Sequence, residues 1–452
     1  MKKIKMMMAA ALGVLVSCGS VKSGEEVVAA SRDSKVVVAY VTSWSEVMPD
    51  PQYMTHINYA FGHVNESFNG VKIDNEERLR QIVDLRKQKP ELKVLLSIGG
   101  WGSGRFSEMA ANDEYRRAFA ADCDRVVKEF ALDGIDIDWE YPTSSMANIS
   151  SSPDDTENFT LLMQDIRAAI GNEKELTLAT VASARYIDFK AILPSVDFVN
   201  IMAYDMASAP KHHSALYPSG HSGDITSDGA VTAHLKAGVP PSKLVMGMPF
   251  YGRGGDGYPS FQDYNKVGNT DTQYTEKWDE VAQVPYLADK NDTLVFGFEN
   301  PRSLAIKCQY ILDKDLLGGM YWDYSGDNEQ GDLRRTVAEN LLGKPHKAKV
   351  LVLTERGGQH GGFTDAGLKW LAAEGAKGNF SITEINNARN ITEAYLSQFS
   401  LVIQLDFPPY TWPKEAEDAF VKYIEEGRGG WIGFHHATLL GEFDGYPMWQ
   451  WF

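Results

Sequence analysis

From Lys35 onward, short runs rich in Val, Ile and Leu alternate with longer segments of helical periodicity. The longer segments, such as residues 75–89 and 113–131, repeat apolar residues at intervals of three and four, with charged residues between them. This alternation is typical of parallel βα units. Eight apolar runs begin at Val36, His56, Lys93, Gly134, Leu176, Asp197, Leu244 and Gly318. Eight repeats within residues 35–344 predict an α/β fold, a closed (β/α)8 TIM barrel.

The spacing of the runs lengthens after the seventh, the segment LVMGMPFYGR that starts at Leu244. Residues 274–301 intervene before the last helix and strand. We expect them to form a small, partly β insertion on the face of the barrel where the strands end.

A second α/β pattern follows residue 344. Strand-like runs at residues 347–358 and 400–407 flank a helical segment at residues 364–375, and residues 415–436 predict a helix, a glycine turn and a strand. This order predicts a separate, doubly wound α/β domain over residues 346–452. The sequence stops at MWQWF, before such a domain is expected to finish, so we expect the domain to be incomplete.

Residues 1–18 have the composition of an export signal. Lysines at positions 2, 3 and 5 precede an apolar run that is too short for a stable transmembrane helix. The run ends in LVSC, which resembles the lipobox of bacterial lipoproteins, so we expect Cys18 to be lipidated and residues 19–34 to form a tether. The sequence thus predicts an exported bacterial lipoprotein, anchored to the membrane at the periplasmic or surface face of the cell envelope. An ordinary signal peptide with an incidental Cys18 is the alternative.

The acidic composition narrows the class of partner. Sixty-one acidic and 44 basic residues give a net charge of -17, which argues against nucleic acid, because phosphates require clustered Lys and Arg. An uncharged partner suits this balance better. After Cys18 the chain contains Cys123 and Cys308, both in predicted helices, and we expect buried free thiols rather than a disulfide.

The fourth run, LDGIDIDWEYP at residues 132–142, places acids on what otherwise resembles a buried strand. Because side chains alternate along a strand, Asp136, Asp138 and Glu140 should point into the barrel and the apolar residues between them outward. Three ionised carboxylates in a dry interior repel one another, so at least one should be protonated. Glu140, nearest the carboxyl end where barrel enzymes keep their active sites, is the natural proton donor. We expect Asp133 to serve the turn before the strand.

Two other interpretations of these acids remain. A solvated acidic stripe on an edge strand would explain the charges but not the apolar residues beside them. A Mg²⁺ or Ca²⁺ site would also use oxygen ligands. However, Trp101, Tyr204, Tyr251 and Trp322 follow other strands, and their flat apolar rings suit sugars better than ions. We therefore expect neither a metal nor another cofactor.

Five strand-end motifs together resemble glycoside hydrolase family 18. The segment DGIDIDWE is similar to that family's DxxDxDxE motif, and SIGG at residues 97–100 to its SxGG motif. MAYD at residues 202–205, GMPFYGR at 247–253 and GGMYWDY at 318–324 are similar to the ends of its sixth, seventh and eighth strands. The resemblance covers residues 35–344. The form DWEYP is closer to the chitinase branch than to the endo-β-N-acetylglucosaminidase branch.

The resemblance implies retaining, substrate-assisted hydrolysis of β-1,4-linked N-acetylglucosamine polymers or oligomers. Glu140 would protonate the glycosidic oxygen, while the acetamido carbonyl of the substrate attacks the anomeric carbon. Asp138 would stabilise the resulting oxazolinium ion, with Asp136 beneath it sharing a proton. Tyr204 would hold the acetamido oxygen.

The remaining implied contacts surround the sugar. Asp205 would hold the distorted ring, Trp322 would lie beneath it, and Gly99 and Gly100 would let the backbone approach it closely. Further substrate contacts are expected from Tyr40, Phe61, Trp101, Tyr141, Met202, Tyr251 and Arg253. Ordinary core packing remains an alternative for Tyr40 and Phe61. After MAYD the chain continues MASAPKHH, without the aromatic-His continuation common in chitinases, which leaves the contacts there open.

Two other functions remain open for the barrel. An endo-β-N-acetylglucosaminidase acting on glycoprotein glycans would use the same fold, and the shape of the groove would distinguish it. A non-catalytic carbohydrate-binding barrel arises where relatives lose the acid, which this chain retains as Glu140.

The C-terminal segment GGWIGFHHA resembles the trehalose-utilisation family, which is related to glutamine amidotransferases. No Cys follows Cys308, so an amidotransferase nucleophile is missing. His435 and His436 would lie at a strand end as ligands, as catalytic groups or as structural residues.

Overall fold

The computed structural model describes residues 35–255, 258–267, 273–343, 348–354, 356, 361–375, 380–406 and 412–438. The expected signal, the tether and Cys18 lie outside the described residues. Within these ranges, no helix has both the length and the apolar character that crossing a membrane requires.

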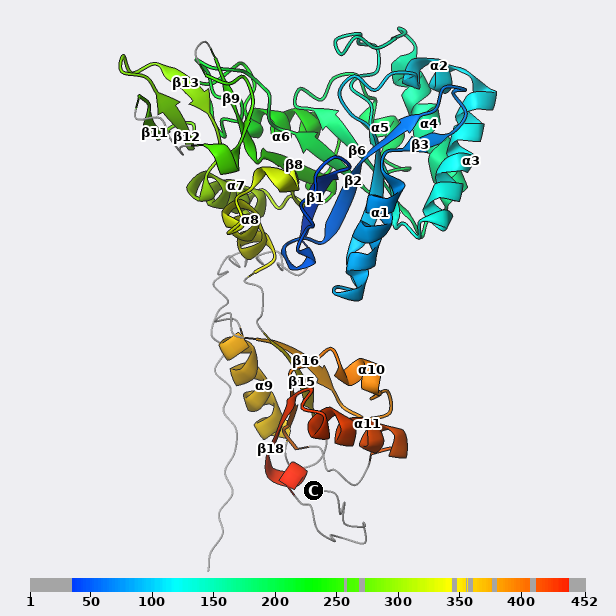
Figure 1. The fold of residues 1–452 in the computed structure, drawn as a ribbon, viewed down its shortest axis with the longest axis vertical. Helices are drawn as coiled ribbons and strands as arrows, with labels where there is room; N and C mark the ends of the chain where they lie inside the picture. The colour runs from blue at the N-terminus through cyan, green and yellow to red at the C-terminus, as the bar shows by residue number, and fades with distance from the viewer. Residues whose placement is uncertain are drawn as a thin grey trace, which may run out of the picture.

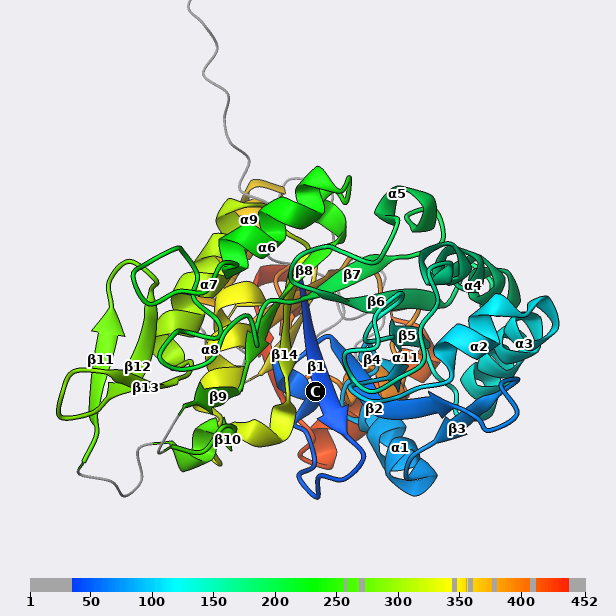
Figure 2. The ribbon, with the colours of Figure 1, turned by 90° about the horizontal axis from the view of Figure 1, so that it is seen from above.

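A closed ring of eight parallel strands occupies the described part of the chain from residue 36 to residue 322. The strands are β1 (Val36–Thr42), β2 (His56–Val64), β4 (Lys93–Gly99), β5 (Gly134–Asp138), β6 (Glu175–Val181), β7 (Phe198–Met202), β8 (Leu244–Pro249) and β14 (Gly318–Trp322). They pair in the order β1-β14-β8-β7-β6-β5-β4-β2, and β2 pairs back to β1. Figure 2 shows the ring from above, with helices around it. The predicted barrel is confirmed, whereas the short strand β3 (Val71–Ile73), antiparallel to β2, was not predicted.

The helices around the ring cover the outward faces of the strands. They are α1 (Glu76–Val83), α2 (Phe106–Ala111), α3 (Asp113–Glu129), α4 (Asp155–Ile170), α5 (Phe189–Ile192), α6 (Ser227–Lys236), α7 (Pro301–Asp313) and α8 (Asp332–Leu341). On β5, Ile135 and Ile137 are fully buried in the main core, and Trp139 beyond them stacks on Phe106 of α2 at 5.3 Å. The alternation along this strand therefore matches the prediction: apolar residues face the helices and the acids face inward. Cys123 and Cys308 are buried and free, as expected.

The insertion after β8 begins earlier than predicted. The sequence suggested one strand through LVMGMPFYGR, but β8 ends at Pro249, and β9 (Tyr251–Gly254) leaves the barrel to pair antiparallel with β13 (Leu294–Gly297). Proline has no N–H for the ladder, which favours a strand end there. The insertion is a five-stranded sheet that also contains β10 (Gln262–Asp263), β11 (Thr275–Asp279) and β12 (Val284–Ala288). Its β character was predicted, but its attachment through β9 was not.

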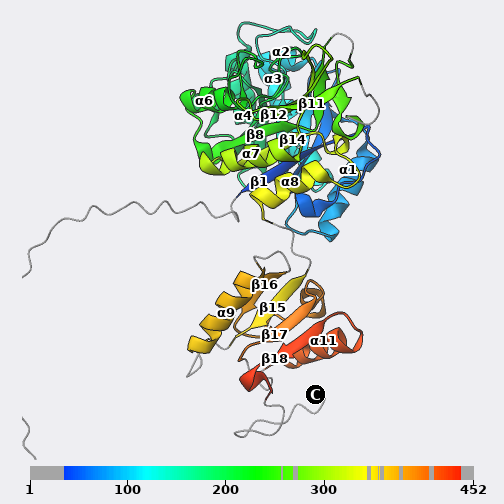
Figure 3. The same ribbon diagram turned by 90° about the vertical axis from the view of Figure 1, so that its left-hand side faces the viewer.

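The C-terminal region forms a separate α/β sandwich (Figure 1). Its parallel sheet has the order β16-β15-β17-β18. The strands are β15 (Lys349–Leu353), β16 (Ser381–Ile385), β17 (Leu401–Gln404) and β18 (Gly430–Gly433), and the helices are α9 (Gly361–Gly375), α10 (Glu393–Leu396) and α11 (Lys414–Glu425). Figure 3 shows α9 on one face of the sheet and α11 on the other.

Two apolar layers explain this arrangement. Val350 and Val352 of β15 pack with Leu371 of α9, whereas the alternate residues Leu351 and Leu353 belong to a cluster that contains α11. The doubly wound prediction is confirmed, but strand β16 was missed because Thr383 and Glu384 interrupt its apolar character. The side chains of His435 and His436 lie outside the described residues.

Candidate active site

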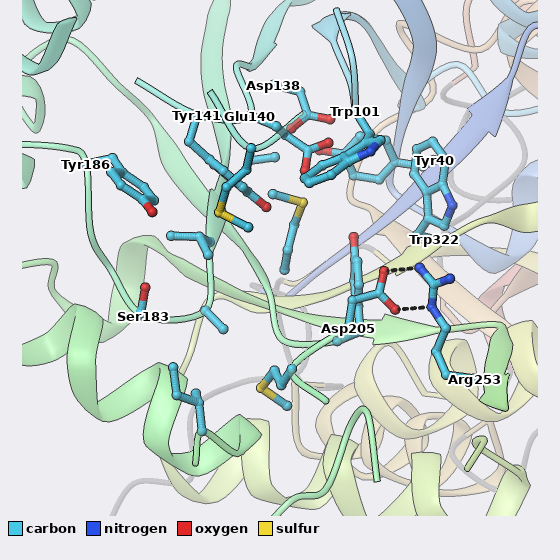
Figure 4. A pocket seen from close by; sticks show the side chains of 18 of the residues that line it. Tyr40, Trp101, Asp138, Glu140, Tyr141, Ser183, Tyr186, Asp205, Arg253 and Trp322 are labelled. Atoms are coloured by element: carbon cyan, nitrogen blue, oxygen red, sulfur yellow. Dashed lines mark hydrogen bonds and ion pairs between the residues drawn. The ribbon is translucent and has the colours of Figure 1, made fainter. Parts of the chain in front are cut away.

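A cavity of about 720 Å³ lies where the barrel strands end. Its wall contains Asp138, Glu140 and Tyr204 from the predicted catalytic group, and every predicted substrate contact except the two glycines. These contacts are Tyr40, Phe61, Trp101, Tyr141, Met202, Asp205, Tyr251, Arg253 and Trp322. Figure 4 shows Asp138 and Glu140 on the wall opposite the Asp205–Arg253 pair. Residues from well-separated parts of the sequence thus converge on one site.

Asp136 lies beneath this cavity and is fully buried. The hydroxyl groups of Tyr40 and Ser97 each donate to its Oδ2 at 2.8 Å. The Thr177 hydroxyl and the Asn200 amide donate to its Oδ1 at 2.6 and 3.3 Å. Burial raises the pKa of Asp136, and the four hydrogen bonds oppose that rise because they favour the ionised form. The carboxyl group thus connects β5 to β1, β4, β6 and β7 below the site.

The two acids above Asp136 have raised pKa values. Burial raises the pKa of Asp138 well above its usual range, and the charges of Glu140 and Asp136 raise it further. Burial raises the pKa of Glu140 to about 7. A hydrogen bond with Tyr141 opposes this rise, and the charge of Asp205 adds to it. A carboxyl group with a pKa near 7 can hold and release a proton at neutral pH, as a general acid requires.

Two polar groups on the cavity wall lack a strong protein partner. Asp138 is buried, and its Oδ1 has no hydrogen-bond partner among the described residues. The Tyr204 hydroxyl lies 3.8 Å from Sδ of Met320, which is a weak acceptor. Buried polar groups normally have partners, so these two groups, both on residues that line the cavity, are left for a ligand to satisfy.

Asp205 sits on the other side of the cavity and is held by the insertion. Its backbone has a positive φ of 54°, shortly after the end of β7. Nε and Nη2 of Arg253, on β9, donate to its two carboxylate oxygens at 2.7 Å each. Burial opposes ionisation of Asp205, but the contacts with Arg253 and His213 outweigh it and lower the pKa. Asp205 is therefore ionised at neutral pH, whereas Glu140, with a pKa of about 7, is only partly ionised.

Aromatic side chains form the base and the rims of the cavity. The Trp322 ring lies 5.6 Å from the ring of Tyr40 and stacks on Phe61 at 5.5 Å. Trp44 and Trp101 leave 64% and 62% of their surface exposed while they line the cavity. Large exposed aromatic faces on a cavity wall suit flat, partly apolar ligands such as sugar rings.

The two predicted glycines, Gly99 and Gly100, pack closely against neighbouring residues. A Cβ on Gly99, at φ 133°, would lie 2.0 Å from the carbonyl oxygen of Asp138, and one on Gly100, at φ 92°, would lie 2.7 Å from the Phe61 ring. Neither glycine lines the cavity. Their small size therefore lets the end of β4 pack against Asp138 and Phe61, which is an indirect contribution to the site.

Asp133 lies at the opposite end of β5, as predicted. Its Oδ2 accepts a hydrogen bond from the Val94 backbone N–H at 2.7 Å and another from Arg86. Among the described residues, no group of three or more His, Cys, Asp or Glu side chains is arranged to hold a metal ion.

Comparison with known proteins identifies the barrel. Residues 36–327 match the model of glycosyl hydrolases family 18. The chain belongs to this family. Chitinase A1 of Niallia circulans is 30% identical over 409 residues, a match that covers 67% of this chain and 58% of that protein. Chitotriosidase-1 of Mus musculus is 31% identical over 350 residues, covering 65% and 74%.

Solved structures agree with this assignment. A family 18 N-acetylglucosaminidase from Paenibacillus barengoltzii is 32% identical with a TM-score of 0.63, and the match covers 68% of this chain and 99% of that one. The family 18 chain is therefore a glycoside hydrolase. Residues 349–452 match the model of trehalose utilisation, which confirms the resemblance seen in the sequence.

Sequence reasoning missed two groups of residues in this family 18 site. Ser97, Thr177 and Asn200 bind Asp136. Their inward positions on β4, β6 and β7 follow from strand alternation, so the pattern could have found them. The second group lies on loops around the cavity, where no periodic signal exists: Trp44, Met146, Ser183, Arg185, Tyr186, Met206 and Phe261.

Proposed function

We propose that the barrel hydrolyses β-1,4-linked N-acetylglucosamine polymers or oligomers, with retention of configuration and with the substrate's acetamido group as nucleophile. The observation that carries the proposal is the pair of groups without strong partners, Oδ1 of Asp138 and the Tyr204 hydroxyl. An acetamido group has one N–H donor and one carbonyl acceptor. It therefore complements an acceptor and a donor on two residues that line the same cavity.

The first step of the proposed reaction breaks the glycosidic bond. Glu140 gives its proton to the glycosidic oxygen as the acetamido oxygen attacks the anomeric carbon and the bond to the leaving sugar breaks. Asp138 accepts a hydrogen bond from the acetamido N–H. The positive charge of the oxazolinium ion favours the ionised form of Asp138, which in turn stabilises that ion, while Tyr204 orients the acetamido oxygen. The raised pKa of Glu140, about 7, supports its role as the acid.

The second step returns the enzyme to its starting state. The Glu140 carboxylate takes a proton from a water molecule, which opens the oxazolinium ring by attack at the anomeric carbon. Two attacks on opposite faces of this carbon give net retention. Asp205, fixed by Arg253, holds the distorted sugar, and Trp322 supports its apolar face.

Product analysis tests this proposal against its alternatives. We would incubate the protein with chitin oligosaccharides and, separately, with a high-mannose glycopeptide. Release of short N-acetylglucosamine oligomers or of the monosaccharide from the first substrate alone supports the proposal. Release of the glycan from the glycopeptide would instead identify an endo-β-N-acetylglucosaminidase, and binding without products would identify a carbohydrate-binding barrel.

We also propose that the protein is an exported bacterial lipoprotein anchored through Cys18. The support is the signal-like run that ends in LVSC. If Cys18 carries lipid, the full-length protein should partition into detergent, and Cys18→Ser should release it or block its maturation. Equal partitioning of the two forms would favour an ordinary signal peptide.

A further inference from the structure

His213 is a fully buried residue that the proposed reaction does not use. It belongs to the connection between β7 and α6, and its side chain has no exposed surface. It is absent from the cavity lining, but its ring lies 5.3 Å from the ring of Tyr251, which lines the cavity. His213 therefore lies one layer behind the wall.

The imidazole of His213 faces the back of Asp205. Its Nδ1 lies 3.4 Å from Oδ1 of Asp205, and neither ring nitrogen has a closer hydrogen-bond partner among the described residues. A neutral imidazole carries one N–H, and a buried N–H needs an acceptor. The Asp205 carboxylate is the acceptor within reach, so this setting favours the tautomer with hydrogen on Nδ1. Contacts of this kind are often long without substrate and shorten when substrate binds.

Buried interactions fix the backbone on both sides of this imidazole. The Met206 N–H donates to the His213 carbonyl at 3.0 Å. The Ser214 hydroxyl donates to Oε1 of Glu299 at 2.6 Å, and Lys307 donates to the same carboxylate and to the Ser214 carbonyl. Lys307 and Glu299 have no exposed side-chain surface, so movement of this segment would remove the hydrogen bonds of Ser214 from a buried ion pair. His213 is therefore a fixed point rather than a mobile side chain.

We propose that His213 is a positioning residue that holds Asp205 from behind and so orients it toward the reacting sugar. The inference rests on the proposed function for the role of Asp205. Arg253 binds both carboxylate oxygens, but its side chain is 32% exposed. The imidazole of His213, which has no exposed surface, adds a second contact to the same carboxylate from the buried side. It also keeps the charge of Asp205 close to Glu140, and this charge raises the pKa of Glu140.

Three substitutions at His213 separate a hydrogen-bonding role from a space-filling role. Asn places an amide N–H near the position of Nδ1, Gln places one near Nε2, and Leu fills the space without a donor. We expect His213→Leu and His213→Gln to lower kcat roughly tenfold or more with a smaller change in KM, because orientation matters most in the transition state. We expect His213→Asn to restore most of the lost rate.

His234 offers a matched control. It is also a fully buried histidine, with Nδ1 bound to the Ala230 carbonyl at 2.8 Å, but it is outside the cavity wall and packs on Phe189. His234→Leu should lower thermal stability without changing kcat. A folded His213→Asn variant as slow as His213→Leu, or unchanged kcat in folded His213→Leu, would overturn the proposal.

A spectroscopic measurement tests the contact independently of catalysis. The side-chain carboxyl of Asp205 is followed by carbon NMR as a function of pH in the full-length protein and in each variant. Loss of a donor to the ionised form should raise the pKa of Asp205 in His213→Leu, with little change in His213→Asn or His234→Leu. An unchanged Asp205 titration in His213→Leu would refute the contact. If the wild-type protein cleaves none of the sugars, the proposed function fails, and this titration still decides whether His213 holds Asp205.

Discussion

Partly buried acids occupy both ends of the barrel in opposite electrostatic settings. At the amino ends of the strands, Glu175 lies between two basic side chains: Nε2 of His56 is 3.0 Å from its Oε2, and Lys93 binds its Oε1. Burial opposes ionisation of Glu175, but these contacts outweigh it and lower the pKa. At the carboxyl ends, Glu140 is also partly buried, but no cation is among the groups that shift its pKa, which burial raises to about 7.

This difference shows that burial alone does not set the direction in which the pKa of a carboxyl group shifts. Both acids lose hydration, and the neighbouring charge determines the direction of the pKa shift. The amino end pairs its acids, as Asp133 with Arg86 also illustrates, and so serves stability. At the carboxyl end, Glu140 has no such cation, so its ionised form is disfavoured. It therefore keeps a proton available for chemistry.

Replacing Glu140 or Glu175 with glutamine tests this comparison with the largest expected effect. Glu140→Gln preserves shape but removes the acid, so turnover of N-acetylglucosamine oligomers should fall by at least ~10²-fold. Glu175→Gln, the matched change at the other end, should leave turnover near that of the wild type. Initial rates of both variants provide the measurement, and near-normal hydrolysis by Glu140→Gln would remove the proton-donor assignment.

The pH profile of the wild-type protein sharpens the contrast. A general acid works when protonated, and Glu140 loses its proton as the pH rises through about 7. The value of kcat/KM should therefore fall above pH 7, approaching tenfold per pH unit. Rates measured with soluble oligomers from pH 4 to 10 give the pH at which kcat/KM begins to fall. A flat profile up to pH 9 would contradict the assignment of the raised pKa to Glu140.

The Asp205–Arg253 pair is the exception at the carboxyl end, because Asp205 is paired with a cation. Arg253→Lys keeps the positive charge but cannot make the two-pronged contact with both oxygens. We expect kcat/KM to fall by roughly tenfold or less, since Asp205 stays charged but is held less firmly. Steady-state kinetics measure the effect. If kcat/KM of Arg253→Lys matched that of the wild type, the contact of Arg253 with both carboxylate oxygens would have no role in orienting Asp205.

The smallest expected effect is on stability at the amino end. Glu175→Gln should lower the free energy of unfolding by about 1–2 kcal/mol at neutral pH, because it removes a partly buried acid from His56 and Lys93. The folded pKa of Glu175 lies below its unfolded value of about 4.3, so the stabilisation is complete above that pH and disappears as the pH falls toward the folded value. Urea unfolding at pH 7 and pH 3 should show a difference between wild type and variant that shrinks in acid. A constant difference would argue against ionic pairing.

Prediction from the sequence succeeded where a regular period carried the information. The alternation in residues 134–140 placed Asp136, Asp138 and Glu140 on the inner face of the barrel, and the apolar runs gave all eight strands. It failed where geometry depends on contacts between distant segments. The departure of the chain from the barrel after Pro249, which brings Arg253 to Asp205, depends on pairing between β9 and β13, and no local pattern encodes that pairing.

Loops and buried partners were the other limit. Trp44 and Arg185 lie on loops without periodicity, so nothing in the sequence placed them on the cavity wall. The close packing of Gly99 against Asp138 and of Gly100 against Phe61 was not predicted, because it depends on contacts between different segments. Motifs identify which residues matter, but packing decides what each residue touches.

The central claim is that the substrate's acetamido group is the nucleophile and Glu140 the acid. The most direct measurement compares matched chitin oligosaccharides with N-acetylglucosamine or with glucosamine at the cleaved residue, while the first-released anomer is recorded by NMR. The account predicts hydrolysis of the acetylated substrate with the β-anomer released first, and binding without cleavage at glucosamine, because that sugar has no carbonyl to attack with. Efficient cleavage at glucosamine, or first release of the α-anomer, would contradict it.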